Sequence, residues 1–64
     1  MTLLKEYDKI RLKTGQRGTI IEIFKDGILL AEVVNERGGI DIEEIHPEKV
    51  KAVIKEVEEP LVLA

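Results

Sequence analysis

Segment 19–34 combines two β-prone runs with Asp26-Gly27 between them, a pattern that restricts this part of the chain to a β-hairpin. The first run reads Thr-Ile-Ile-Glu-Ile-Phe, and the second reads Ile-Leu-Leu-Ala-Glu-Val-Val. Branched side chains are stiff at χ1 and pack well on a pleated surface, so both runs favour strands. Because Asp and Gly tolerate the positive φ of a type I′ turn, we predict a two-residue hairpin loop.

Two further segments alternate between apolar and polar residues with the period of two that indicates half-buried strands. They are 7–12, which reads Tyr-Asp-Lys-Ile-Arg-Leu, and 40–43, which reads Ile-Asp-Ile-Glu. The polar, glycine-containing segments 14–18 and 35–39 are predicted to be turns. Four strands are therefore expected before residue 46.

Segment 50–57 is open to two interpretations. Its apolar residues have the i, i+3, i+4, i+7 spacing of a helix: Val50, Val53, Ile54 and Val57. The alternative is an edge strand with Val53 and Val57 on one face. Four preceding strands need a partner to close the sheet, so we predict the strand. Pro47 lies just before it and cannot donate to a ladder, which predicts a break with one 3₁₀ turn.

Short strands separated by close glycine-containing turns are typical of a small barrel or sandwich. A chain of 64 residues is too short for a sandwich of about seven strands, but it accommodates a five-stranded barrel. We expect one all-β domain over 1–64, with the barrel at about 7–57 and an apolar C-terminal tail at 58–64. Because the sequence has no cysteine, hydrophobic burial must stabilise this small core.

The predicted hairpin raises a problem of register. A two-residue loop pairs Phe24 with Leu29 and Glu22 with Ala31. That pairing places Glu22 among apolar side chains. One extra residue near Ile21-Glu22 reverses the alternation and adds the bend that a tightly curled barrel requires. We therefore predict a β-bulge at this position.

The stretches Asp8–Leu12, Gly15–Ile23 and Ala31–Val33 together resemble SH3-like barrels of the KOW type. In those proteins a first strand is followed by a G-x-x-G-x-[Ile/Val] turn and by a hairpin that ends in an apolar-Glu-apolar strand. The likeness is greatest to small stand-alone bacterial and archaeal proteins of uncharacterised function, which also carry a Pro-containing turn, here His46–Val50. It covers about Tyr7–Val57. It implies a five-stranded SH3-like barrel with a short 3₁₀ turn before the last strand.

The charge pattern bears on nucleic-acid binding. The net charge is −3, which argues against unaided binding to a phosphate backbone. Basic residues on or near the predicted turns nevertheless provide a candidate basic patch. The expected contacts, should the chain bind RNA, are Arg11, Arg17, Lys25 and Arg37.

No catalytic, metal or cofactor site is predicted. His46, the single histidine, is expected to be an exposed or capping turn residue, since catalysis needs a base, an orienting group and a reacting group in one pocket. The acidic clusters at 43–48 and 56–59 match no metal-binding loop and are expected to be solvated faces. Gly15 and Gly18 precede a strand rather than a helix, so we interpret them as turn glycines and not as a phosphate-binding loop.

The C-terminal residues Leu61, Val62 and Leu63 are apolar and follow an acidic stretch. Such a segment is suited to covering a sheet edge on a second copy or to contacting a partner protein. We expect a non-enzymatic protein-interaction or assembly module, with a protein partner or a homo-oligomer, and a KOW-type RNA-binding accessory domain as the alternative. No apolar run approaches the ~20 residues of a transmembrane helix and no signal peptide is indicated, so we expect a cytoplasmic protein.

Overall fold

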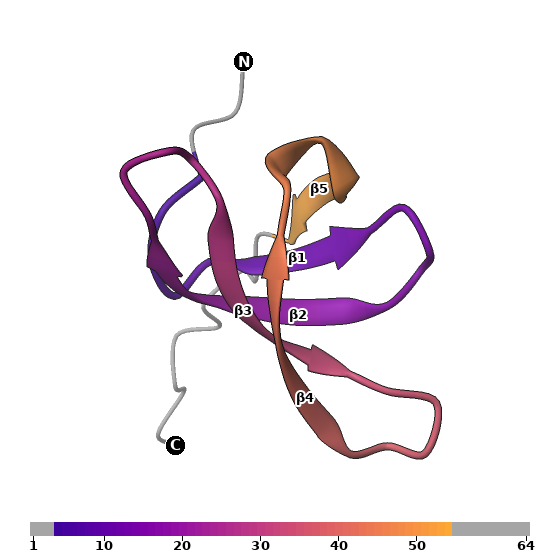
Figure 1. Ribbon diagram of the computed structural model, residues 1–64. Coiled ribbons are helices and arrows are strands. Elements are labelled where there is room, and N and C mark those ends of the chain that lie inside the picture. Colours follow the sequence, from indigo (N-terminus) through magenta and orange to yellow (C-terminus); the bar gives the residue numbers. More distant parts are fainter. Residues whose placement is uncertain (1–3, 55–64) are drawn as a thin grey trace, which may run out of the picture.

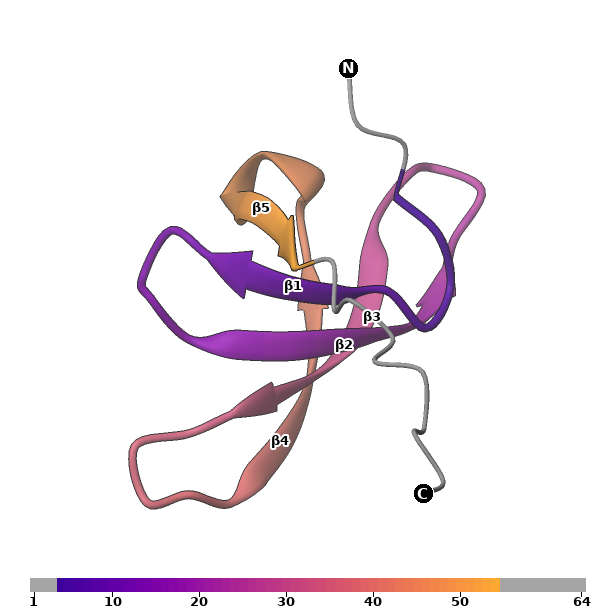
Figure 2. The same cartoon turned by 180° about the vertical axis from the view of Figure 1, so that it is seen from behind.

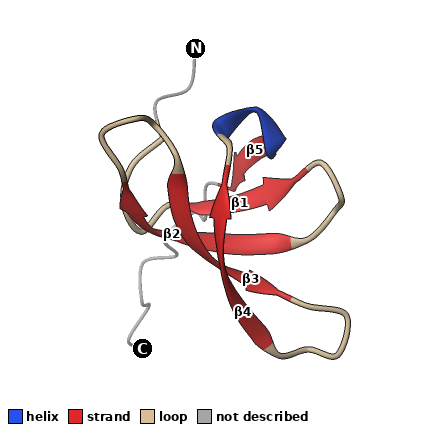
Figure 3. Cartoon of the chain, in the orientation of Figure 1, coloured by secondary structure: helices blue, strands red, loops and turns tan. Residues whose placement is uncertain are grey.

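Five short strands form one antiparallel sheet that curls around its own core in the computed structural model, which describes residues 4–54 (Figures 1 and 2). The strands are β1 (Lys9–Leu12), β2 (Arg17–Ile23), β3 (Leu29–Val34), β4 (Ile40–Ile45) and β5 (Val50–Ile54), with the 3₁₀ turn η1 (Pro47–Lys49) before β5 (Figure 3). Their order across the sheet is β4-β3-β2-β1-β5. The all-β, barrel-like fold with a 3₁₀ turn before the last strand is confirmed.

The core is built from aliphatic side chains that β1 to β4 direct inward. Its buried members are Ile10, Leu12, Ile20, Leu29, Ala31, Val33 and Ile45, and Leu4, Ile23, Val50 and Val53 pack against them. Full burial of a Val, Leu or Ile side chain contributes roughly 1.5–3 kcal/mol. This cluster is therefore the main source of stability in a chain without disulfides.

The predicted bulge in β2 is confirmed. Pairing with β3 passes from Glu22↔Leu30 to Ile20↔Ala31, so that Ile21 is the extra residue. Ile20 and Ile23 consequently both face the core although they lie three positions apart, and Glu22 is exposed. The bulge thus fills the interior and keeps the carboxylate in water.

A second bulge explains the helix-like spacing in the last strand. Pairing of β5 with β1 passes from Ala52↔Arg11 to Val50↔Leu12, which leaves Lys51 as an extra residue. Val50 and Val53 therefore both pack on the core despite their i, i+3 spacing. The strand predicted for 50–57 is confirmed over Val50–Ile54; the rest of that segment and the tail at 58–64 lie outside the described residues.

Three hairpins close with the same kind of loop, which is three residues long and ends in a glycine with positive φ. The glycines are Gly15 (φ 95°), Gly27 (φ 91°) and Gly38 (φ 81°). In each loop this glycine donates its N–H to the carbonyl oxygen of the residue three positions earlier. This geometry is a type I turn followed by a G1 bulge, which requires a left-handed residue at its end.

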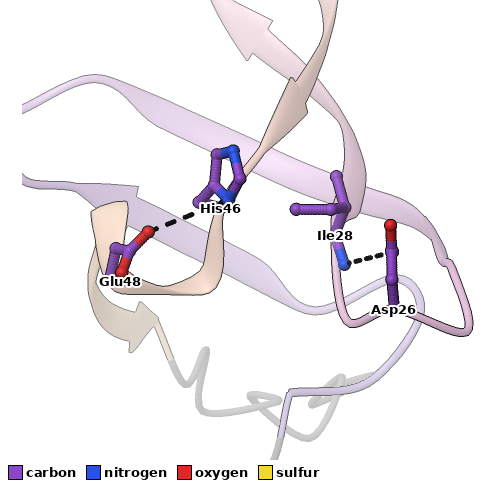
Figure 4. Close-up of polar contacts among 4 residues, drawn as sticks. All are labelled: Asp26, Ile28, His46 and Glu48. Carbon is purple, nitrogen blue, oxygen red and sulfur yellow. Dashed lines mark hydrogen bonds and ion pairs between the residues drawn. The ribbon is translucent and has the colours of Figure 1, made fainter.

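The predicted two-residue loop at Asp26-Gly27 is wrong. Ile23, rather than Phe24, pairs with Leu29, and Phe24 donates its N–H to the Ile28 carbonyl oxygen at 2.9 Å. Asp26 does not adopt positive φ. Its Oδ1 instead accepts the Ile28 N–H at 3.0 Å, an Asx-type contact that stabilises the longer loop (Figure 4).

The first strand is shorter than predicted, because Tyr7 lies in a turn at its start. Tyr7 has φ of 71° and donates its N–H to the Ile20 carbonyl oxygen at 2.7 Å, and Asp8 donates to the Lys5 carbonyl oxygen at 3.2 Å. The strand begins at Lys9. The expected alternation beyond that point is confirmed by the burial of Ile10 and Leu12.

Gly18 is a strand residue, and its prediction as a turn glycine is wrong. Because the preceding loop is only three residues long, β2 begins at Arg17. Gly18 therefore lies in β2, opposite Val33. A Cβ atom on Gly18 would lie 3.0 Å from the Glu32 carbonyl oxygen and 3.5 Å from Val33 Cγ2. The absence of a side chain therefore allows β2 and β3 to pack closely.

We expect Gly18→Ala to lower the free energy of unfolding by about 1–3 kcal/mol, because the added methyl group overpacks the β2–β3 contact. Urea denaturation followed by circular dichroism measures this change. Arg17→Ala, at the exposed neighbouring position, is the matched control and should stay within about 0.5 kcal/mol of the wild type. Equal stability of Gly18→Ala and the control would contradict the close approach.

Candidate functional site

Strand pairing arranges outward-facing side chains in two rows that cross the sheet. The first row contains Ile54, Lys9, Thr19, Glu32 and Ile42, one residue from each strand. The second contains Ala52, Arg11 and Arg17 and continues with the pair Val34–Ile40. Each row therefore has apolar residues towards both edges of the sheet and basic residues on β1 or β2.

The β4 side of these rows is an exposed apolar surface. Val34 is 42% exposed, Ile40 60% and Ile42 66%. We call these three residues the β4 patch. They belong to the end of the β3–β4 hairpin that projects away from the other strands in both views (Figures 1 and 2). Because a rigid sheet holds these side chains in water, their burial by a partner would be favourable.

The β4 patch was not identified from the sequence, although a signal was present. Ile40 and Ile42 lie on one face of β4. Ile45 is three residues after Ile42, so it lies on the other face. The strand predicted at 40–43 forms, but its predicted half-burial is wrong, because all four residues are exposed and only Ile45 of β4 enters the core. Asp41 and Glu43 pair with Val33 and Ala31 on the core side of the sheet yet are exposed. Because Ile42 and Ile45 lie on opposite faces of the strand, either Ile40 and Ile42 or Ile45 had to face outward.

A groove with a volume of about 670 Å³ lies between the β1–β2 and β3–β4 turns. It is lined by Arg11, Thr14, Gly15, Gln16, Arg17, Val34, Asn35 and Glu36. Gln16 Nε2 donates to the Val34 carbonyl oxygen at 3.1 Å, which ties the two turns together. Thr14 Oγ1 in turn accepts the Gln16 N–H at 3.3 Å. These contacts hold the groove walls in place through polar groups.

A smaller hollow of about 270 Å³ on the outer face links the groove to the β4 patch. Its lining includes residues from all five strands: Lys9, Arg17, Gly18, Thr19, Glu32, Val34, Ile40 and Ile54. Arg17 and Val34 line both depressions. The basic and apolar surfaces are therefore continuous.

The structure brings together some of the basic residues named from the sequence and separates others. Arg11 and Arg17 are paired on adjacent strands and line the same groove. Arg37 lies in the β3–β4 turn at the same end of the sheet. Lys25 lies in the β2–β3 turn at the opposite end (Figures 1 and 2). The four residues do not form one patch.

His46 is exposed, as expected, and lies outside the lining of both depressions. Its Nδ1 is 3.8 Å from Glu48 Oε1, and the two side chains are 65% and 75% exposed (Figure 4).

Within residues 4–54, no group of three or more His, Asp or Glu side chains is arranged to hold a metal ion. That same part of the chain contains no helix of the length and apolarity needed to cross a bilayer. Leu61, Val62 and Leu63 lie outside the described residues.

Asn35 organises the β3–β4 turn beside the groove. Its Oδ1 accepts the N–H of Arg37 at 3.0 Å and the N–H of Gly39 at 2.9 Å, and its Nδ2 donates to Asp41 Oδ2 at 3.3 Å. One side chain thus joins both ends of the loop to the start of β4.

We expect Asn35→Ala to destabilise the fold by about 1–2 kcal/mol, because two backbone N–H groups lose their common acceptor. Thermal unfolding measures the loss. The amide exchange rates of Arg37 and Gly39 should increase more than those of residues in the distant strands. Glu36→Ala, at the exposed next position, serves as the control. An unchanged exchange rate at both amides would show that the side chain does not order the turn.

Comparisons with known proteins found no match to this chain among protein-family models, curated proteins or solved structures. The resemblance to KOW-type barrels stays a prediction from the residues that carry it. The features of this chain that bear on function are therefore the basic groove and the exposed β4 patch that it adjoins.

Proposed function

We propose that this chain is a non-enzymatic, cytoplasmic protein-interaction or assembly module that binds through the outer face of the β3–β4 hairpin. The observation that carries the proposal is the exposure of Ile40 (60%) and Ile42 (66%) on the edge strand β4. Full burial of such a side chain contributes roughly 1.5–3 kcal/mol. Burial of both isoleucines by a partner would therefore favour binding.

The surroundings of the isoleucines support binding over a purely structural role. Neither residue belongs to the core cluster, so their apolar character is not needed to fill the interior. Val34 extends the apolar surface next to Ile40, and the depression beside it is lined by Arg17. An apolar centre with an arginine at its border is a composition common in protein interfaces.

We expect the double variant Ile40→Thr/Ile42→Thr to fold normally and to lose at least about 1–2 kcal/mol of binding free energy, because the partner no longer buries two isoleucines. Quantitative affinity capture from native lysate, together with light scattering for self-association, compares it with the wild type. Tyr7→Asn is the matched control, since Tyr7 is 75% exposed and lies in a different turn. Equal capture by all three proteins would contradict the proposal.

The C-terminal segment Leu61, Val62 and Leu63 is part of the same proposal as a second apolar contact. Truncation after Pro60 forms a further arm of this experiment. We expect reduced partner recovery or a lower mass by light scattering. Unchanged partner recovery and unchanged mass would show that the tail is not part of the interface. The β4 patch would then be the remaining proposed contact.

RNA binding as a KOW-type accessory domain is a second candidate, and one observation favours it. Arg11 and Arg17 are cross-strand neighbours and line one groove together with polar side chains from two turns. Such a groove presents two guanidinium groups to the same phosphate or to successive phosphates. It provides a local basic surface on a chain of net charge −3.

The salt dependence of RNA affinity tests this candidate. If the groove contacts phosphates, Arg11→Gln/Arg17→Gln should flatten the plot of log affinity against log salt by about 1.4, the value for two contacts to a single strand. Lys25→Gln, at the opposite end of the sheet, should leave the slope unchanged. Equal slopes for all three proteins, or no measurable affinity at low salt, would exclude RNA binding at this groove.

A further inference from the structure

The free edge of β4 has features that the proposed function leaves unexplained. β4 pairs with β3 along its whole length, and within residues 4–54 no segment pairs with its other edge. Five consecutive residues from Ile40 to Glu44 are exposed. Exposed edges of this kind are templates for another strand and are usually covered or protected.

The register identifies which backbone groups face the free edge. Asn35 donates its N–H to the Gly39 carbonyl oxygen at 2.8 Å, so these residues form a hydrogen-bonded pair at the end of the hairpin. Antiparallel ladders alternate bonded and non-bonded pairs. The backbone N–H and C=O groups of Asp41 and Glu43 are therefore directed towards β3. Those of Ile40, Ile42 and Glu44 are directed away from it and are positioned to bond an added strand.

The two faces of β4 differ in chemistry next to this edge. Ile40 and Ile42 project from the outer face, and Asp41 and Glu43 project from the face shared with Val33 and Ala31. Asp41 accepts a hydrogen bond from Asn35. Glu43 forms no ion pair with any lysine or arginine of residues 4–54. An added strand would place alternate side chains beside isoleucines and beside carboxylates.

A second copy of β4 is a poor occupant of the edge. Only Ile40, Ile42 and Glu44 direct backbone groups to this edge, so an antiparallel ladder between two copies sets these residues opposite one another and thereby aligns like faces. Every such register that overlaps by half the strand or more then places a carboxylate opposite a carboxylate. The pairs are Asp41 with Asp41, Asp41 with Glu43, Glu43 with Glu43, or Glu44 with Glu44. Like charges directly opposite each other destabilise a sheet, so the edge is protected against self-pairing.

We propose that the free edge of β4 binds an extended peptide segment of a partner protein in which apolar residues alternate with lysine or arginine. The segment adds as a sixth strand. Its backbone bonds to Ile40, Ile42 and Glu44, its apolar side chains pack on the isoleucines, and its basic side chains pair with Asp41 and Glu43. This inference rests on the proposed function, since it specifies the partner of the β4 patch.

The test uses the full chain and three short capped peptides. The first alternates lysine with valine, the second alternates glutamate with valine, and the third contains the lysines and valines of the first in two separate blocks. Nuclear magnetic resonance titration measures affinity and amide exchange. We expect the alternating lysine peptide to bind about tenfold more tightly than either of the others, because only it matches both faces.

Amide exchange supplies the sharper readout. Binding at the edge should slow exchange at Ile40, Ile42 and Glu44, while Asp41 and Glu43 change little because their N–H groups already face β3. Slowing spread evenly along the strand, or confined to the groove beside Arg17, would overturn the proposal. So would equal affinity for the three peptides.

Charge reversal separates edge recognition from the overall charge. Asp41→Lys/Glu43→Lys should reverse the preference in favour of the glutamate peptide. Glu22→Lys/Glu48→Lys, which alters two exposed acids away from this edge by the same charge, should keep the original preference. A preference that follows net charge in both variants would overturn the proposal. Heteronuclear spectra of each variant verify folding, and the wild-type peptide comparison stands independently of them.

The outcomes also separate this inference from the proposed function. If no peptide binds while Ile40→Thr/Ile42→Thr still loses its protein partner, the edge-strand mode is wrong and the interaction module stands. If the double isoleucine variant captures partners as the wild type does and no peptide binds, both are wrong. RNA binding at the groove without peptide binding would likewise overturn the edge-strand mode.

Discussion

Within residues 4–54, five short strands enclose seven buried aliphatic side chains. This requires the sheet to bend sharply, and the other features of the fold follow from this requirement. Two bulges add to this bend, one at Ile21 in β2 and one at Lys51 in β5. Each bulge brings two apolar residues three positions apart onto the same inner face. Gly18 permits the close approach of β2 and β3, because an added Cβ atom would lie 3.0 Å from the Glu32 carbonyl oxygen.

The limited extent of the core determines which surfaces of β4 are exposed. Only the Ile45 end of β4 reaches the core, so the rest of the strand lies beyond it and is exposed on both faces. Ile40 and Ile42 occupy the outward positions of this strand, because Asp41 and Glu43 share the face of Val33 and Ala31. They remain outside next to Val34, and the carboxylates of Asp41 and Glu43 occupy the inward side of an edge. The proposed interface on β4 is in this sense a consequence of the strand's extension beyond the core.

One type of loop, used three times, sets the positions of the polar groups. The three-residue turns ending at Gly15 and Gly38 lie at the same end of the sheet and border one groove, which Gln16 bridges. The turn ending at Gly27 lies at the other end. Arg11 and Arg17 therefore share a site from which Lys25 is separated, although all three are basic residues in or near turns.

Local sequence was sufficient to predict the first four strands, the 3₁₀ turn and the bulge at Ile21, because period-two patterning and the backbone limits of proline and glycine act over a few residues. The fifth strand was predicted only from the need to close the sheet, since the local spacing of its apolar residues is helical. Other features depended on partners distant in the chain. Ile45 is buried in the core, whereas Ile40 is not part of it. Gly18 lies in a strand that packs closely on β3. Pairing with β1 makes Val50–Ile54 a strand rather than a helix. These choices depend on which strands meet and how much volume they enclose, and neither quantity is contained in a short window of residues.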